Sequence, residues 1–111
     1  MPIVSLPMYD LPEVAPHTDT LWRGLAAAMR KAGLGDVPDS LTRGEDHAAA
    51  WDSPDLLFSQ TCGYPLTHAY RGRLALVATP IYAAPGCQGT NYRSFVMVRR
   101  DDPATRIADL K

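Results

Sequence analysis

Short apolar segments alternate with segments of helical periodicity along this chain, and that alternation constrains its fold more than any other feature. Strand-like composition predicts strands over residues 3–9, 37–41, 56–59, 74–79 and 94–98. The run 74–79 is nearly all apolar, which is typical of a strand covered on both faces. The alternation therefore predicts an α/β fold: a mostly parallel open sheet with helices on both faces.

The clearest helix follows Thr18-Asp19, which offers an N-cap. Its expected apolar face recurs at helical spacing, is widened by Trp22 and Ala26, and consists of Leu21, Leu25, Ala28, Met29 and Ala32. Gly33 provides the stop. A capping box at Thr42-Arg43-Gly44-Glu45 predicts a second helix over 43–51, and a third is expected over 65–70.

The ending "IADLK" resembles a helix that begins near Thr105 and carries no stop signal. We therefore expect residues 1–111 to be one domain from a longer protein, truncated at its C-terminus. The length of 111 residues suits one domain.

Composition and charge exclude several classes of partner. A net charge of −1 gives no electrostatic reason to expect nucleic acid or an anionic membrane as a partner. No apolar run approaches the roughly 18 residues of a membrane-spanning helix, so no membrane insertion is expected. No signal-peptide pattern precedes the strand-like stretch at Ile3. The sequence thus indicates either a cytoplasmic chain or one whose export signal has been removed.

The stretch "SQTCGYP", residues 59–65, lies where a strand ends and a helix begins. In parallel sheets, ligands bind at the carboxyl ends of the strands, where loops 7–12, 60–65 and 81–93 are expected. Free N–H groups at a helix start favour anions, and Ser59 and Thr61 could add hydroxyl donors. Gly63 would let the backbone approach a ligand closely. The alternative is that Thr61 merely caps the helix.

Tyrosines gather in or beside these loops, at positions 9, 64, 82 and 92. A tyrosine at the mouth of a cleft offers a ligand both an apolar face and a hydroxyl. Arg93 could bind an oxyanion with its guanidinium fork. The alternatives are that the tyrosines pack over strand ends and that Arg93 is solvated.

The signals for an enzyme or a metal site are weak, so we expect no catalysis and no cofactor. Cys62 and His68 could form a nucleophile and base, but no third group supports them. A metal set of Cys62, Cys87, His47 and His68 lacks a ligand-pair spacing such as C-x-x-C. A disulfide between Cys62 and Cys87 would require an oxidising compartment, and two reduced thiols are the alternative.

Six motifs, in order, carry a resemblance to a known family: "SLPMYDLPE", "SQTCGYPL", "PGCQG", "YRS", "FVMVRRDDP" and "IADLK". In these motifs the chain resembles the phosphate, phosphite and phosphonate substrate-binding proteins of ABC transporters, a branch of the type 2 periplasmic-binding-protein superfamily. The resemblance implies a two-lobed clamshell, of which this chain would be a partial first lobe. It also implies a small phosphorus oxyanion as ligand, bound between the lobes and covered by aromatic side chains.

Carried over position by position, the resemblance places Tyr9 where the first strand delivers an aromatic side chain to the cleft. It assigns the second ligand loop to Thr61, Cys62, Gly63 and Tyr64. Tyr92 and Arg93 would lie near the cleft side of the strand that approaches the hinge. With Ser59 from the strand end, these eight residues are the expected ligand-binding set.

The resemblance further implies an ABC transporter permease as partner and a periplasmic location, although the chain shows no signal peptide. A half clamshell would leave an unpaired sheet edge and bare apolar surface, so a homodimer or swapped assembly is expected. The alternative function is a solute-binding or sensor domain for another small ligand, working without a transporter.

Overall fold

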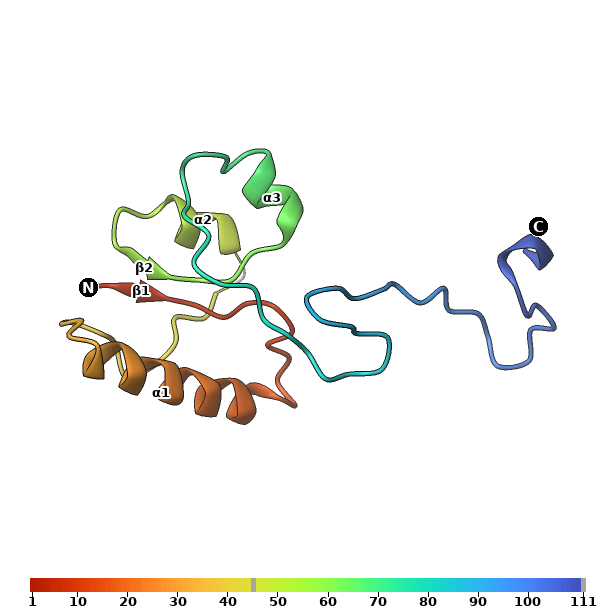
Figure 1. Ribbon diagram of the computed structural model, residues 1–111, viewed down its shortest axis with the longest axis horizontal. Helices are drawn as coiled ribbons and strands as arrows, with labels where there is room; N and C mark the ends of the chain where they lie inside the picture. Colours follow the sequence, from red (N-terminus) through yellow and green to blue (C-terminus); the bar gives the residue numbers. More distant parts are fainter. Residues whose placement is uncertain (45, 111) are drawn as a thin grey trace. The chain divides into compact units, whose positions relative to one another are not determined.

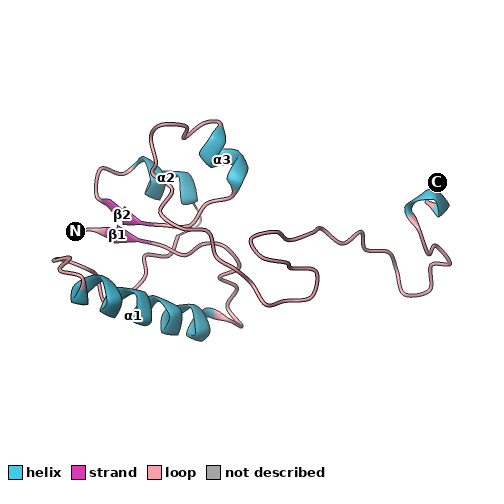
Figure 2. Ribbon diagram, viewed as in Figure 1, coloured by secondary structure: helices cyan, strands magenta, loops and turns pink. Residues whose placement is uncertain are grey.

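The structure, a computed structural model, describes residues 1–44 and 46–110 (Figure 1). Its contacts divide the chain into two units, Met1–Ala75 and Leu76–Lys111, which we describe separately. The interpretation of the chain as one domain stays a prediction. The first unit holds both strands and all the α-helices of the described residues. The cyan turn near the C-terminus in Figure 2 is a 3-10 helix of the second unit.

The first unit is a small α/β structure built on a two-stranded parallel sheet. Strand β1 spans Ile3–Val4 and β2 spans Leu56–Phe58, with Ile3 opposite Leu56 and Val4 opposite Phe58. Helix α1 (Ala15–Lys31) lies on one side of the sheet (Figure 1). Helices α2 (His47–Asp52) and α3 (Gly63–Thr67) lie on the other side. For this unit, the predicted α/β class and the predicted parallel pairing of strands are confirmed.

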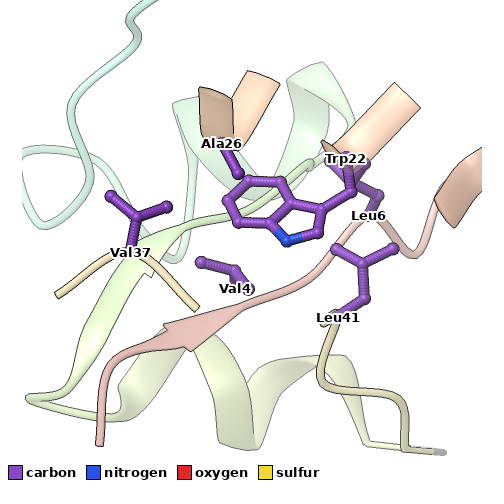
Figure 3. Packing of buried hydrophobic residues seen from close by; sticks show 6 residues of the cluster. All are labelled: Val4, Leu6, Trp22, Ala26, Val37 and Leu41. Atoms are coloured by element: carbon purple, nitrogen blue, oxygen red, sulfur yellow. The ribbon is translucent and has the colours of Figure 1, made fainter. Parts of the chain in front are cut away.

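The core of this unit forms where α1 packs on β1. Trp22 and Ala26 of α1, each 1% exposed, pack against the side chains of Val4, Leu6, Val37 and Leu41 (Figure 3). The Trp22 indole N–H donates to the Pro38 carbonyl at 3.1 Å, which satisfies its polar atom inside the core. The predicted face was partly wrong, because Leu21, Ala28 and Ala32 are exposed. Trp22 and Ala26, which were expected only to widen that face, are its buried centre. Burial of the large indole sets the rotation of the helix.

Helix α1 begins earlier than the sequence indicated, so Thr18 is not its N-cap. Val14 occupies that position without a side-chain cap, and Pro16 sits in the first turn, where a missing N–H costs little. The Thr18 hydroxyl instead donates back to the Val14 carbonyl at 3.4 Å. The predicted stop is confirmed: Gly33 has φ +93°, and its N–H donates to the Arg30 carbonyl.

The expected strand 37–41 is not a strand, and β1 ends at Val4 rather than at residue 9. Val37 and Leu41 are nevertheless buried, and the Thr42 N–H donates to the Val4 carbonyl at 2.7 Å. The N–H groups of Ile3 and Ser5 point the opposite way, to Asp55 and Phe58. Strand β1 therefore has backbone partners on both edges. Pro7 limits its length because proline cannot donate to the ladder.

Helix α2 starts at His47 rather than at residue 43, because Asp46 supplies the cap. Its carboxylate accepts from the N–H groups of Ala48 and Ala49. The predicted capping box includes Glu45, which lies outside the described residues. Helix α3 starts two residues before the predicted Pro65 and ends at Thr67 rather than at Tyr70.

The second unit departs most from expectation. Among residues 76–110 the structure has one isolated bridge, Gln88 to Asn91, and one 3-10 turn, η1 (Ile107–Asp109). The strands predicted over 74–79 and 94–98 are not formed, and the helix expected from Thr105 shrinks to that turn. Their apolar side chains are exposed apart from the half-buried Leu74, since an extended segment becomes a strand only when a neighbour bonds its backbone. No helix in the described ranges has the length and apolar character to cross a membrane.

Candidate functional site

The loops that follow β1 and β2 meet at one edge of the sheet. Because the strands are parallel, their carboxyl ends lie together. The Met8 N–H donates to the Gln60 side-chain oxygen at 3.2 Å, and the Cys62 thiol lies 3.6 Å from the Met8 sulfur. We call Met8–Asp10 together with Gln60–Tyr64 the loop junction. It brings five expected site residues into one region: Tyr9, Thr61, Cys62, Gly63 and Tyr64.

Ser59 directly precedes the Gln60–Tyr64 part of the loop junction, and its hydroxyl already has partners inside the protein. Its oxygen is 2.7 Å from the Ser5 hydroxyl, accepts from the Trp51 indole N–H at 3.1 Å and is 3.3 Å from the Gln60 carbonyl. These contacts join β1, α2 and the end of β2. The geometry gives Ser59 a structural role, and any ligand would have to displace one of these hydrogen bonds.

Thr61 and Cys62 lead into α3 without capping it. Cys62 occupies the N-cap position but makes no side-chain cap hydrogen bond. The Thr61 hydroxyl donates to the Cys62 carbonyl at 3.1 Å rather than accepting from the helix, so Thr61 does not cap α3. Gly63 is exposed, and a Cβ built on it would meet no atom within 4 Å. The observed packing thus leaves room for a side chain at position 63.

The two tyrosines of the loop junction are strongly exposed. Tyr9 is 66% exposed and has φ +63°, in the left-handed region that most residues avoid. Tyr64 is 73% exposed, and its ring stacks on His68 with centroids 4.0 Å apart. The His68 Nδ1 contacts the Thr67 hydroxyl and the Tyr64 carbonyl, each at 3.0 Å. The two members of the weakly indicated Cys62–His68 dyad therefore contact other groups: Cys62 contacts the Met8 sulfur, and His68 contacts residues of α3.

Arg43 forms an ion-pair network beside the loop junction that no local sequence pattern predicts. Its Nε donates to Asp10 at 2.7 Å and its Nη2 to Asp19 at 2.8 Å. The Asp10 carboxylate is only 11% exposed. The hydrogen bond from Arg43 lowers the pKa of Asp10, and the bonds to Asp10 and Asp19 raise the pKa of Arg43. The TRGE motif gave no hint of partners 33 and 24 residues away.

A pocket of about 360 Å³ opens beside this network, and no sequence motif indicates it. Its lining comes from β1, the loop after it, residues 42–44 and α2. The lining residues are Ile3, Ser5, Leu6, Pro7, Asp10, Thr42, Arg43, Gly44, Asp46, His47, Ala49 and Ala50. The charged groups Asp10, Arg43 and Asp46 already have partners inside the protein, so the unengaged lining is chiefly apolar.

Tyr92 and Arg93 belong to the second unit, so the structure describes them apart from the other six expected site residues. Both are exposed, Tyr92 by 73%. Locally, Gly86 has φ +85°, and a Cβ there would lie 2.8 Å from the Phe95 ring and 3.2 Å from Arg93 Cγ. The stem of Arg93 and the Phe95 ring therefore pack closely over Gly86.

Both cysteines are free thiols, Cys62 exposed and Cys87 half-buried. Within the described ranges, His, Cys, Asp and Glu side chains form no group of three or more that could hold a metal ion. Neither observation assigns a function to the thiols.

Comparisons of this chain with protein-family models, with curated proteins and with solved structures found no match.

Proposed function

We propose that this chain is the ligand-binding first lobe of a solute-binding protein of an ABC transporter, with a small phosphorus oxyanion such as phosphate, phosphite or a phosphonate as ligand. It would bind without catalysis. The proposal combines the resemblance with one observation: the two loops at the carboxyl edge of the parallel sheet meet at the Met8–Gln60 hydrogen bond. In α/β sheets this edge is where ligands bind.

The chemistry of the loop junction suits an oxyanion held by neutral donors. The N–H groups of Gly63 and Tyr64 and the phenols of Tyr9 and Tyr64 are donors at one edge. The Thr61 hydroxyl would join them by exchanging its bond to the Cys62 carbonyl for one to the ligand. Such donors stabilise an anion when they are preorganised, even without a neighbouring cation. Arg93 would add a charged fork in the complete protein.

The finer fold is part of the same proposal. Strand β1 lies between β2 and the Thr42 segment, with helices on both sides, an arrangement compatible with a doubly wound sheet. In the type 2 periplasmic-binding-protein lobe we propose, segments 74–79 and 94–98 would become further strands. A permease as partner and the periplasm as location follow from the resemblance, and a cytoplasmic location is the alternative.

The proposal is tested by calorimetric titration of phosphate, phosphite and methylphosphonate into the chain, with sulfate as the comparison anion. The same titrations are made on the chain extended through a second lobe, where we expect the tighter binding. In the extended chain, Thr61→Val and Tyr9→Phe should each weaken binding by about tenfold or more, since each removes one donor. Thr20→Val, on the outer face of α1, is the matched control. If the extended chain binds no phosphorus oxyanion, the proposed function is wrong.

The pocket beside Arg43 favours the second candidate, a solute-binding or sensor domain for another small ligand. Its volume of about 360 Å³ falls within the range of roughly 300–1,000 Å³ typical of small-molecule sites. Its unengaged lining is chiefly apolar, which suits an organic molecule better than a bare oxyanion. Binding of an organic solute that Ala50→Trp abolishes and Thr61→Val leaves unchanged would support this function over the first.

A further inference from the structure

Tyr9 holds a backbone conformation that a tyrosine adopts only when its surroundings impose it. Its φ of +63° lies in the left-handed region, where the Cβ of an L-residue is crowded. Such residues persist where neighbouring contacts over-determine the local structure, and they concentrate at functional sites. The question is which contacts hold this turn.

The turn is fixed on both sides of Tyr9. On one side, the Met8 N–H donates to the Gln60 side chain, and Met8 also contacts Cys62. On the other side, the Asp10 carboxylate is bound by Arg43 at 2.7 Å and 3.4 Å. Asp10 is mostly covered while Tyr9 is 66% exposed, so the anchor points inward and the phenol ring outward.

Arg43 connects its own segment to two others through a single guanidinium group. It binds Asp10 of the loop after β1 and Asp19 of α1, and it follows Thr42, whose N–H bonds to β1. A planar fork can bind two carboxylates from different directions, whereas the ammonium of lysine is a point charge on a flexible stem. The network thus ties the turn to both the helix and the strand.

We propose that Arg43 is a positioning residue, which acts through Asp10 to hold the Met8–Asp10 turn and so aim Tyr9 at the ligand edge of the sheet. Its effect on ligand affinity rests on the proposed function, whereas its effect on the turn does not. Arg43 would not touch the ligand.

The test compares amide hydrogen exchange at Met8 in the original chain and in Arg43→Gln, Arg43→Lys and Arg99→Gln. Arg99 pairs with Asp101 at 3.5 Å, and both side chains are well exposed, so Arg99→Gln controls for loss of a surface charge. We expect Arg43→Gln to speed Met8 exchange at least tenfold, Arg43→Lys to speed it less, and Arg99→Gln to leave it unchanged. Unchanged Met8 exchange in a folded Arg43→Gln chain would overturn the proposal.

A second comparison distinguishes loosening of the turn from general loss of the fold. Tyr9→Gly removes the strain, because glycine adopts positive φ readily. If Arg43 holds a strained turn, Arg43→Gln should speed Met8 exchange much less in the Tyr9→Gly background than in the original chain. Equal acceleration in both backgrounds would overturn the proposal.

Titration with methylphosphonate separates this inference from the proposed function. Binding that falls about tenfold in Arg43→Gln, and is largely retained in Arg43→Lys, would support positioning of Tyr9 for the ligand. If the original chain binds no methylphosphonate, that result counts against the proposed function, and Met8 exchange still decides whether Arg43 holds the turn.

Discussion

The hydroxyls of Ser5 and Ser59 lie 2.7 Å apart, just beyond the ends of the two parallel strands. Ser5 is buried, and the Ser59 oxygen also accepts from the Trp51 indole N–H. This hydrogen bond joins the ends of the two strands, from which the loops of the loop junction begin.

Replacing Ser59 with Ala should destabilise the protein by about 1–3 kcal/mol, because it leaves the buried Ser5 hydroxyl and the Trp51 N–H without a partner. Urea unfolding followed by circular dichroism measures the loss. Ser94→Ala, at an exposed position, is the control and should change stability by less than about 0.5 kcal/mol. Equal effects of the two substitutions would contradict a fastening role for Ser59.

Trp22→Ala should cost about 3–5 kcal/mol, since it empties the centre of the core. Trp22→Phe keeps an aromatic ring and loses the hydrogen bond to Pro38, so it should cost less. The control is Leu21→Ala on the exposed face of α1, where the side chain is 53% exposed. Denaturant midpoints of the three variants check the order; a Leu21 effect as large as that of Trp22 would refute the observed rotation of α1.

Stability should fall in acid partly through Asp10. Its folded pKa is lowered by the hydrogen bond from Arg43, so the pair stabilises above the usual aspartate pKa, and the stabilisation is lost as pH falls through the folded pKa. The stability difference between the original chain and Asp10→Asn should therefore be about 1 kcal/mol near neutral pH and shrink below about pH 4. A difference that stays constant down to pH 2 would be the contrary result. The pKa of Asp109 is also lowered, but Asp109 is present in both chains, so its contribution to the pH dependence drops out of the stability difference.

Two glycines, one inside α1 and one just beyond its end, should respond oppositely to replacement by alanine. Gly24 lies inside α1 with open space around its missing Cβ, so Gly24→Ala should stabilise by about 0.5–1 kcal/mol. Gly33 ends the helix with φ +93°, so Gly33→Ala should destabilise by about 1 kcal/mol. Thermal melts of both variants decide the matter, and stabilisation by Gly33→Ala would show that the helix ends differently.

The chain should associate through its exposed strand-like segments, as a homodimer or swapped assembly. Val77 is 74% exposed and Val96 is 64% exposed, within segments of strong strand composition. Sedimentation at micromolar concentrations should show self-association that Val77→Lys and Val96→Lys reduce, with Val14→Lys as control. A monomeric profile of the original chain would refute this expectation.

The sequence predicted the features that depend on local pattern. Helix α1 and its glycine stop, the short apolar strand at Leu56 and the meeting of parallel strand ends follow from periodicity and turn chemistry. The sequence did not predict the features that depend on partners distant along the chain. The network of Arg43 with Asp10 and Asp19 has no local signature, and segments 74–79 and 94–98 require neighbouring strands that composition cannot supply. The start of α2 was missed because Asp46 competes with Thr42 as a cap.

Strand β1 is bonded on both edges, by β2 and by the Thr42 N–H, whereas β2 pairs with β1 alone among the described residues. The sheet is thus asymmetric in its capacity to grow. A further strand could therefore hydrogen-bond to the outer edge of β2 but not to β1, both of whose edges are occupied. If that strand ran parallel to β2, its last residues would lie next to Thr61 and Cys62. Each added strand would therefore extend the carboxyl edge of the sheet and place new side chains beside the loop junction.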